Sequence, residues 1–231
     1  MPKGARSPAA LVSAGAPILC LDTCTILDIM RDLTRDTTKA HEARAAQAVI
    51  AAMESGRALG MVAAQVEAEI SDNRQKVEDE ATQNLTAMRN RLRRMDEVAA
   101  LFGSVGFTSI DHMDGYCVSA RGWMDRLLNA AIRVKPSAAV AQKANLRSIQ
   151  GRAPAPKGQG GIKDCLVFET YLELGRKLQA VGLAQPLVLV SSNTSDYGST
   201  GTPKPEIQAD VSSVNMDFYS SLSAARHSLG I

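Results

Sequence analysis

One stretch near the N-terminus sets the architecture of this chain: Pro17-Ile18-Leu19-Cys20-Leu21-Asp22-Thr23-Cys24-Thr25-Ile26-Leu27-Asp28. Its first five residues can fill a buried strand, and the residues after Asp22 have the pattern of a helix that packs back on that strand. In an open α/β sheet, ligands bind beyond the carboxyl ends of the strands, where helix N-termini also point. A carboxylate at that edge repels anions. We therefore expect Asp22 to hold a cation that an anionic substrate can share.

The composition is that of an ordinary globular protein. The 231 residues are 45% hydrophobic but only 4% aromatic, so the core must be built from aliphatic side chains. This length suits one α/β domain with an insertion, or two small domains.

No apolar run approaches the roughly 18 residues of a membrane span, and no signal-peptide segment opens the chain, so we expect a cytoplasmic protein. The four cysteines form no C-x-x-C pair and the three histidines lack metal-ligand spacing, which does not favour a zinc site.

Alternating strand and helix patterns predict a three-layer α/β fold, with a central, mostly parallel sheet flanked by helices. We expect residues 1–16 to be a disordered tail and residues 17–231 to form a single domain. Helices are predicted from Thr23 to about Leu33 and, capped by Thr37 or Thr38, on to about Glu54. The remaining predicted elements are a strand at 58–63, a long helix from 65 to about 102 with a break left open at 71–73, helices at 116–132 and from 136 to about 150, a helix at 162–181, strands at 187–191 and 214–218, and a helix at 220–229.

The two helices between residues 103 and 150, with the Gly- and Pro-rich loop that follows them, look like an addition to a simpler α/β plan. We therefore predict an inserted helical hairpin at about 103–160. Residues 126–163 contain no Asp or Glu and carry eight positive charges. Because the net charge of the chain is +2, the remaining residues carry −6. This separation suits a protein that binds a polyanion on one face and cations at another, although a solvated helical surface is an open alternative.

Acidic side chains follow the predicted strands. Asp22 comes directly after the first strand, Glu67 and Glu69 open the helix after the second, Asp164 lies in the first turn of a helix, and Asp196 follows the strand at 187–191. Strand–helix–strand connections bring such positions to one rim of a sheet. Carboxylates placed together disfavour one another's charge unless a divalent ion neutralises them. Oxygen ligands alone point to Mg²⁺ or Mn²⁺.

These residues resemble the four acidic motifs of PIN domains, the metal-dependent nucleases that include VapC-type toxins. The motifs are short, and their order and their positions at strand ends carry the resemblance. The matching segments are Leu-Asp-Thr-Cys-Thr-Ile-Leu-Asp at 21–28, Val-Ala-Ala-Gln-Val-Glu-Ala-Glu-Ile at 62–70, Lys-Asp-Cys-Leu-Val-Phe-Glu-Thr at 163–170 and Val-Ser-Ser-Asn-Thr-Ser-Asp-Tyr at 190–197.

The resemblance implies a nuclease that cleaves RNA phosphodiester bonds at a Mg²⁺ or Mn²⁺ site. By position, the catalytic acids would be Asp22, Glu69, Asp164 and Asp196, and all of these except Glu69 would bind metal. Glu67 is the rival of Glu69, which we prefer because Gln-Val-x-x-Glu matches the family's usual lead-in. The chain departs from the family at Asn193, where many members have Asp, so a second metal ion would bind weakly or only with substrate.

We expect a second group of side chains to contact the substrate. Three polar residues could hydrogen-bond the phosphate or a carboxylate, and basic residues of the acid-free stretch would hold the nucleic-acid backbone. The predicted substrate-binding residues are Thr23, Ser192, Asn193, Lys163, Lys157, Arg152 and Arg147.

The expected partners are single-stranded or structured RNA, with no membrane. An inhibitory partner protein and a homodimer both agree with the resemblance. Two other functions stay open. One is a catalytically impaired PIN-like module that binds nucleic acid without cutting it, which Asn193 allows. The other is a haloacid-dehalogenase-type phosphatase, which also begins with a strand and an aspartate but normally has a second Asp two residues on, where this chain has Cys24.

Overall fold

The computed structural model describes residues 6–36, 38–155 and 161–231. Its centre is a five-stranded sheet in the order β3-β2-β1-β4-β7, and every pair of neighbouring strands is parallel. Every residue of the three inner strands is buried, as expected for strands covered on both faces. The predicted α/β fold with a parallel sheet between helices is therefore confirmed. The strands are β1 (Ile18–Leu21), β2 (Leu59–Ala63), β3 (Ile132–Val134), β4 (Leu187–Val190) and β7 (Asp217–Tyr219).

The strand order reverses direction at β1, the strand identified first from the sequence. From β1 the chain runs outward to β2 and β3, and it then crosses back to β4 and β7 on the other side of β1. Leu21, the last residue of β1, lies opposite both Val62 and Val190, so these three strands end level with one another. Such a reversal opens a crevice at the carboxyl ends of the two strands that flank it, here β1 and β4.

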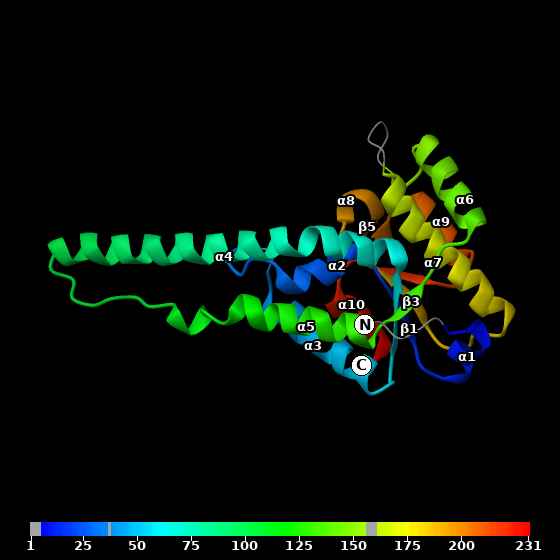
Figure 1. The fold of residues 1–231 in the computed structure, drawn as a ribbon, viewed down its shortest axis with the longest axis horizontal. Helices are drawn as coiled ribbons and strands as arrows, with labels where there is room; N and C mark the ends of the chain where they lie inside the picture. Colours follow the sequence, from blue (N-terminus) through cyan, green and yellow to red (C-terminus); the bar gives the residue numbers. More distant parts are fainter. Residues whose placement is uncertain (1–5, 37, 156–160) are drawn as a thin grey trace.

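Helices cover both faces of the sheet (Figure 1). One layer holds α3 (Ala40–Glu54), α5 (Tyr116–Ala130) and α10 (Leu222–Leu229), in which α3 contacts both of the others. The opposite layer is built around α7 (Ile162–Ala180), which packs on α6 (Ala138–Ile149) and on α1 (Pro8–Ser13). The shorter elements are α2 (Thr23–Leu27), η1 (Asp28–Met30), η2 (Asp111–Met113), α8 (Thr194–Tyr197), α9 (Pro205–Ser212) and the antiparallel pair β5 (Gly198–Ser199) and β6 (Thr202–Pro203).

A long arm projects from this body (Figure 1). Its first limb is α4 (Ala64–Leu101), an unbroken helix of 38 residues, so the break left open at 71–73 does not occur. The chain returns along η2 and α5. The buried residues of α4 end at Leu85, and the apolar side chains at the far end, from Leu101 to Phe107, are exposed.

The arm changes the predicted boundaries of the insertion. The projecting hairpin is formed by α4 and α5 and not by two helices within 103–160. The segment after α5 returns to the body, because β3 pairs with β2 and α6 packs on α7. The helix predicted for 116–132 was expected to end at Ile132, but Ile132-Arg133-Val134 is an edge strand, since its backbone is paired by β2.

The N-terminal segment also differs from the expectation of a tail through residue 16. Ser7 caps α1 by accepting a hydrogen bond from the Ala10 amide, and Leu11 is buried in the core. The helix predicted from Thr23 to Leu33 ends early, at the short turn η1. Asp32, which follows η1, is buried and accepts hydrogen bonds from Thr34 and from Asn84 on α4.

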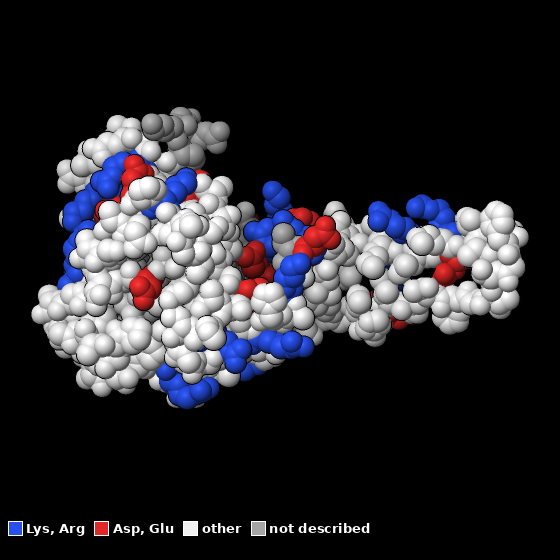
Figure 2. Space-filling view, turned by 180° about the vertical axis from the view of Figure 1, so that it is seen from behind, with Lys and Arg blue, Asp and Glu red and all other residues white. Residues whose placement is uncertain are grey.

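The surface carries both basic and acidic side chains. Seen from behind, basic side chains are interspersed with acidic ones over the body and along the arm, and a group of acidic side chains lies in the recess where the arm leaves the body (Figure 2). Among the described residues, no helix has both the length and the apolar character that a membrane span requires.

Candidate active site

Asp22 is the first residue after β1 and lies at the crevice between β1 and β4. Its backbone amide donates to the Val190 carbonyl, which continues the pairing of the two strands by one residue. The carboxylate caps α2 by accepting the Thr23 amide at 2.8 Å, and it also accepts the Ser191 hydroxyl at 2.6 Å. The side chain is 2% exposed, so Asp22 is a buried carboxylate held by one donor from each of the two strand ends.

Glu69 reaches the same place from the first turns of α4. It accepts the Thr23 hydroxyl at 2.6 Å, and Gln65, one turn earlier, donates to its other oxygen at 2.9 Å. The rival, Glu67, is turned away and forms an ion pair with Arg133 on β3. The structure therefore brings Glu69 to Asp22 and places Glu67 in a contact between the helix and the sheet edge.

Asp164 and Asp196 complete the cluster. The pKa of Asp164 is raised to about 7, first by burial and then by the negative charges of Asp22, Glu69 and Asp196. The pKa of Asp22 rises to about 6, chiefly because of burial, with hydrogen bonds from Ser191 and Thr23 opposing the shift and the charges of Glu69 and Asp196 adding to it. Four acids from distant parts of the chain are thus close enough for their charges to act on the ionisation of Asp22 and Asp164.

Asn193, which replaces a family aspartate, has a local structural role. Its side-chain oxygen caps α8 by accepting the Asp196 amide at 3.3 Å, and its amide donates to the Asp196 carboxylate at 2.7 Å. The oxygen also accepts the Ser195 hydroxyl at 2.7 Å. Asn193 therefore orients Asp196 and adds no charge to the cluster.

Two buried tyrosines support the cluster, and the sequence analysis assigned neither to the site. The Tyr171 hydroxyl donates to the Leu21 carbonyl at 2.6 Å and accepts the Ala63 amide at 3.0 Å, so it ties together the ends of β1 and β2. Tyr197 is fully buried between the rings of Phe168 and Phe218. No partner for its hydroxyl is found among the described residues. Neither role is visible in a linear pattern, because the partners are distant in sequence.

The comparison with protein families agrees with this geometry. The sequence model described as PIN domain matches residues 19–197, which span β1, all four acids and α8. The chain belongs to the PIN-domain family. No curated protein and no solved structure matches it at the significance required. PIN domains are generally nucleases, and membership does not support the alternative of a haloacid-dehalogenase-type phosphatase.

PIN domains typically use divalent metals, and the acids of this PIN domain fit such an ion in their chemistry. Carboxylate oxygens are the ligands that Mg²⁺ and Mn²⁺ prefer, and a bound cation would offset the burial and the neighbouring negative charges that raise the pKa values of Asp22 and Asp164. As the side chains stand, no three His, Cys, Asp or Glu residues in the described ranges are grouped tightly enough to hold an ion. The carboxylates of Asp22, Glu69 and Asp196 are instead turned to hydrogen-bond donors, so binding a metal requires some of these hydrogen bonds to be exchanged.

The basic stretch does not form the free cationic face that was predicted. Arg147 is buried, donates to Glu169 at 2.8 Å, and pairs with Asp210 on α9. It is therefore an internal bridge between α6, α7 and α9, and its assignment as a substrate-binding residue is wrong. Arg126 and Arg133 are also paired with acids from elsewhere in the chain, namely Glu54 and Glu67.

The other predicted substrate contacts fall in three groups. Thr23 and Ser192 lie at the crevice, where the Thr23 hydroxyl holds Glu69 and the Ser192 amide donates to the Thr25 hydroxyl at 3.1 Å. Arg152 is half-buried and lies 3.3 Å from Asp210, whereas Lys163 is exposed in the first turn of α7, next to Asp164. Lys157 lies outside the described residues.

Proposed function

We propose that this protein is a metal-dependent endoribonuclease that hydrolyses RNA phosphodiester bonds at the acidic cluster. One observation carries the proposal: four carboxyl groups from distant segments meet at the crevice between β1 and β4, and the pKa values of two of them are raised by burial and by the other acids. A protein that keeps such groups together without a cation gains nothing in stability. The arrangement is explained if the cluster shares a hard cation with a phosphate.

In this proposal each acid has a stated role. Asp22, Asp164 and Asp196 hold Mg²⁺ or Mn²⁺. The ion, when bound, supplies a Lewis acid for the scissile phosphate and lowers the pKa of water. Glu69, already fixed by Thr23 and Gln65, orients the attacking water or a ligand, and Asn193 keeps the Asp196 carboxylate in place. Lys163, exposed beside Asp164, attracts the RNA backbone to the cluster.

The experiment is a cleavage assay with labelled single-stranded RNA in Mn²⁺, with and without EDTA. Wild-type protein should cut, EDTA should stop cutting, and Asp22→Asn should lower the rate at least about a hundredfold, because a metal ligand is lost. Asp36→Asn is the matched control, since Asp36 is an exposed aspartate with no contact to the cluster, and it should cut like wild type. Cutting that survives both EDTA and Asp22→Asn would overturn the proposal.

The geometry of the cluster also agrees with a second function, an RNA-binding module that does not cut. Asn193 brings no charge, and the described acids are not grouped to hold an ion as they stand. A PIN-domain module that binds RNA without cutting it has these same features. In the same assay, such a module would retain RNA in a binding measurement and leave it intact in Mn²⁺.

The proposed function extends to partners and location. We propose a cytoplasmic enzyme that acts on single-stranded or structured RNA. A cell that makes an endoribonuclease needs to restrain it, so we also propose an inhibitory partner protein. Size-exclusion chromatography with light scattering tests the remaining proposal, a homodimer, because the measured mass is compared directly with the 24.6 kDa of one chain.

A further inference from the structure

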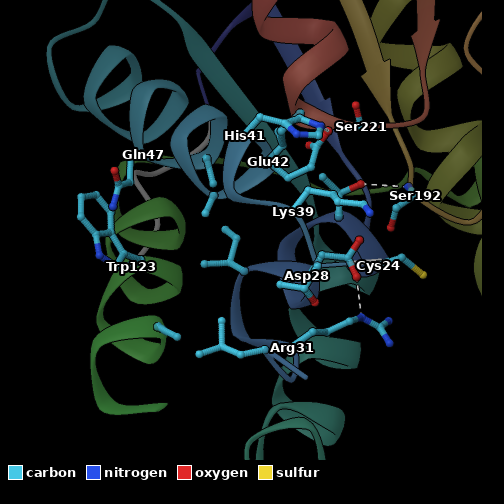
Figure 3. Close-up of a pocket in the computed structure, with 18 of the residues that line it drawn as sticks. Cys24, Asp28, Arg31, Lys39, His41, Glu42, Gln47, Trp123, Ser192 and Ser221 are labelled. Carbon is cyan, nitrogen blue, oxygen red and sulfur yellow. Dashed lines mark hydrogen bonds and ion pairs between the residues drawn. The ribbon is translucent and has the colours of Figure 1, made fainter. Parts of the chain in front are cut away.

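A cavity of about 910 Å³ adjoins the acidic cluster. It lies between η1, the N-terminal end of α3, α5 and the segment that enters α10 (Figure 3). Cys24, Thr25, Ser192 and Asn193 line it on the side of the β1 and β4 ends. These residues directly follow or flank those that hold Asp22 and Asp196, so the cavity and the acidic crevice are neighbouring parts of one surface.

The walls of the cavity are mostly apolar. The chemistry suits a flat group with polar edges, because aliphatic and aromatic side chains line the cavity together with polar and charged side chains. The volume is within the range of pockets that bury small ligands, about 300–1,000 Å³. The apolar wall residues are Ile29, Leu33, Ala43, Ala46, Ile50 and Leu222, with Tyr116, Ala120 and Trp123 contributed by α5.

Unpaired positive charge lies at the rim. Lys39 and Arg35 are exposed, and neither forms an ion pair within the described part of the chain. Arg31 is neutralised by Asp28, and His41 lies 3.4 Å from Glu42. Figure 3 shows Lys39 between these two pairs, on the side of the cavity toward Ser192 and Cys24, while Trp123 and Gln47 lie on the opposite side. Lys39 is therefore on the side of the cavity that faces the ends of β1 and β4.

We propose that this cavity binds the base and sugar of an unpaired nucleotide next to the scissile phosphate, with Lys39 and Arg35 on the flanking backbone phosphates. This inference rests on the proposed function and adds a substrate class, single-stranded RNA. A base in a duplex is stacked and paired and cannot enter, whereas the unstacked bases of single strands are bound by stacking on protein side chains.

The test uses short RNAs in which one nucleotide at a time lacks its base. Binding of a labelled pentamer is measured in EDTA, and metal-dependent cutting of the same RNAs is measured in Mn²⁺. In wild-type protein, removal of one particular base should weaken binding about tenfold, since base stacking contributes at that level. Trp123 is the only tryptophan and lines the cavity, so its emission should change with the intact RNA and change less with that abasic RNA.

Two variants locate the effect. Ala120→Leu adds bulk to the cavity wall, and in this variant the intact and abasic RNAs should bind equally weakly. Lys39→Gln leaves the walls unchanged and should weaken all of the RNAs alike, with a less steep salt dependence. The controls are Ala141→Leu, on an exposed position of α6, and Lys177→Gln, near the end of α7, and both should bind like wild type. Melting temperatures show whether Ala120→Leu folds, and Ala46→Leu fills the same wall from α3 if it does not.

The outcomes separate this inference from the proposed function. Cavity-dependent binding without cutting in Mn²⁺ supports the nucleotide site and overturns the nuclease. Cutting with no sensitivity to any single base, or unchanged in Ala120→Leu, overturns the nucleotide site and leaves the nuclease standing. A Glu-rich peptide containing Phe that changes Trp123 emission, where RNA does not, would also overturn the proposal and assign the cavity to a protein partner.

Discussion

Asp22 performs two tasks with one carboxylate. It caps α2 through the Thr23 amide and holds Ser191 from the neighbouring strand, yet it is also buried in a cluster of acids, and burial together with the neighbouring charges raises its pKa to about 6. The first task stabilises the fold, and the second opposes it whenever the carboxyl group is charged. Substitution of Asp22 by asparagine separates the capping role from the effect of the charge, because asparagine caps helices as well as aspartate does but carries no charge.

We therefore predict that Asp22→Asn makes the metal-free protein more stable. At pH 8 the variant should gain about 1–3 kcal/mol in the free energy of unfolding, since a buried charge beside other acids is removed while the cap is kept. Denaturant unfolding in EDTA measures this change, with Asp36→Asn as the exposed control. A clear loss of stability would show that the Asp22 charge is structural and would weaken the assignment of a metal site.

Tyr197 carries a buried hydroxyl for which the described residues provide no partner. An unsatisfied buried hydroxyl costs about 1–3 kcal/mol. Because the ring packs between Phe168 and Phe218, Tyr197→Phe keeps the aromatic contacts and should leave the melting temperature unchanged or raise it. A fall of several degrees in thermal melting would contradict this prediction. It would mean that the hydroxyl is bonded in solution, with water or a ligand of the acidic cluster as its partner.

At the scale of elements, patterns that depend on local sequence were predictable. β1, β2 and β4 are apolar runs, and the acids that follow them were placed at the correct edge because parallel strands end together. β3 was missed, since three residues with an exposed Arg133 are held as a strand only by β2. The position of the arm was predicted wrongly for a related reason. The helical periodicity of α4 does not show at which residue its apolar side chains cease to pack against the rest of the protein.

The basic stretch shows the same limit of sequence-based prediction for the functional site. Its charges are evident in the sequence, but their partners, Glu54, Glu67 and Asp210, come from other parts of the chain. Whether an arginine is a free ligand for phosphate or half of an ion pair is decided by distant residues. The acids could be predicted because strand ends are local features, whereas Ser191, Tyr171 and Tyr197 act through tertiary contacts.

Arg147 joins three helices and should be essential for stability. Removing it by Arg147→Ala leaves Glu169 with an unpaired buried charge and Asp210 with Arg152 as its partner, and the loss costs about 3–5 kcal/mol. Thermal melting should show a large decrease, whereas Lys143→Ala, one turn earlier on the exposed side of α6, should change little. If instead Arg147→Ala folds normally and loses RNA affinity, the residue contacts substrate after all.

For the whole molecule, the acidic cluster makes stability depend on pH. The pKa values of Asp22 and Asp164 in the folded state, about 6 and about 7, lie above the ordinary value of 3.8, so the folded protein binds protons more tightly than the unfolded chain does. The free energy of unfolding should therefore decrease as pH rises from about 4 through 7, and the penalty is complete above the folded-state values.

This prediction is checked by denaturant unfolding between pH 5.5 and pH 8 in EDTA. Other groups also titrate in this range, so the measured quantity is the difference between wild type and the double variant Asp22→Asn/Asp164→Asn. That difference should grow with pH to about 1–3 kcal/mol or more in favour of the variant. Addition of Mn²⁺ at pH 8 should stabilise wild type and not the variant. A difference independent of pH would contradict the folded-state pKa shifts.

The four acids are contributed by positions that extend from residue 22 to residue 196 of a 231-residue chain. β4, whose end flanks the crevice, is also among the last strands to be synthesised, although it pairs directly with β1, the first. A chain still attached to the ribosome therefore lacks the strand and the last acid until residue 196 has been translated. If the protein cuts RNA, the messenger and ribosome that make it face an unfinished and harmless enzyme up to that point of its synthesis.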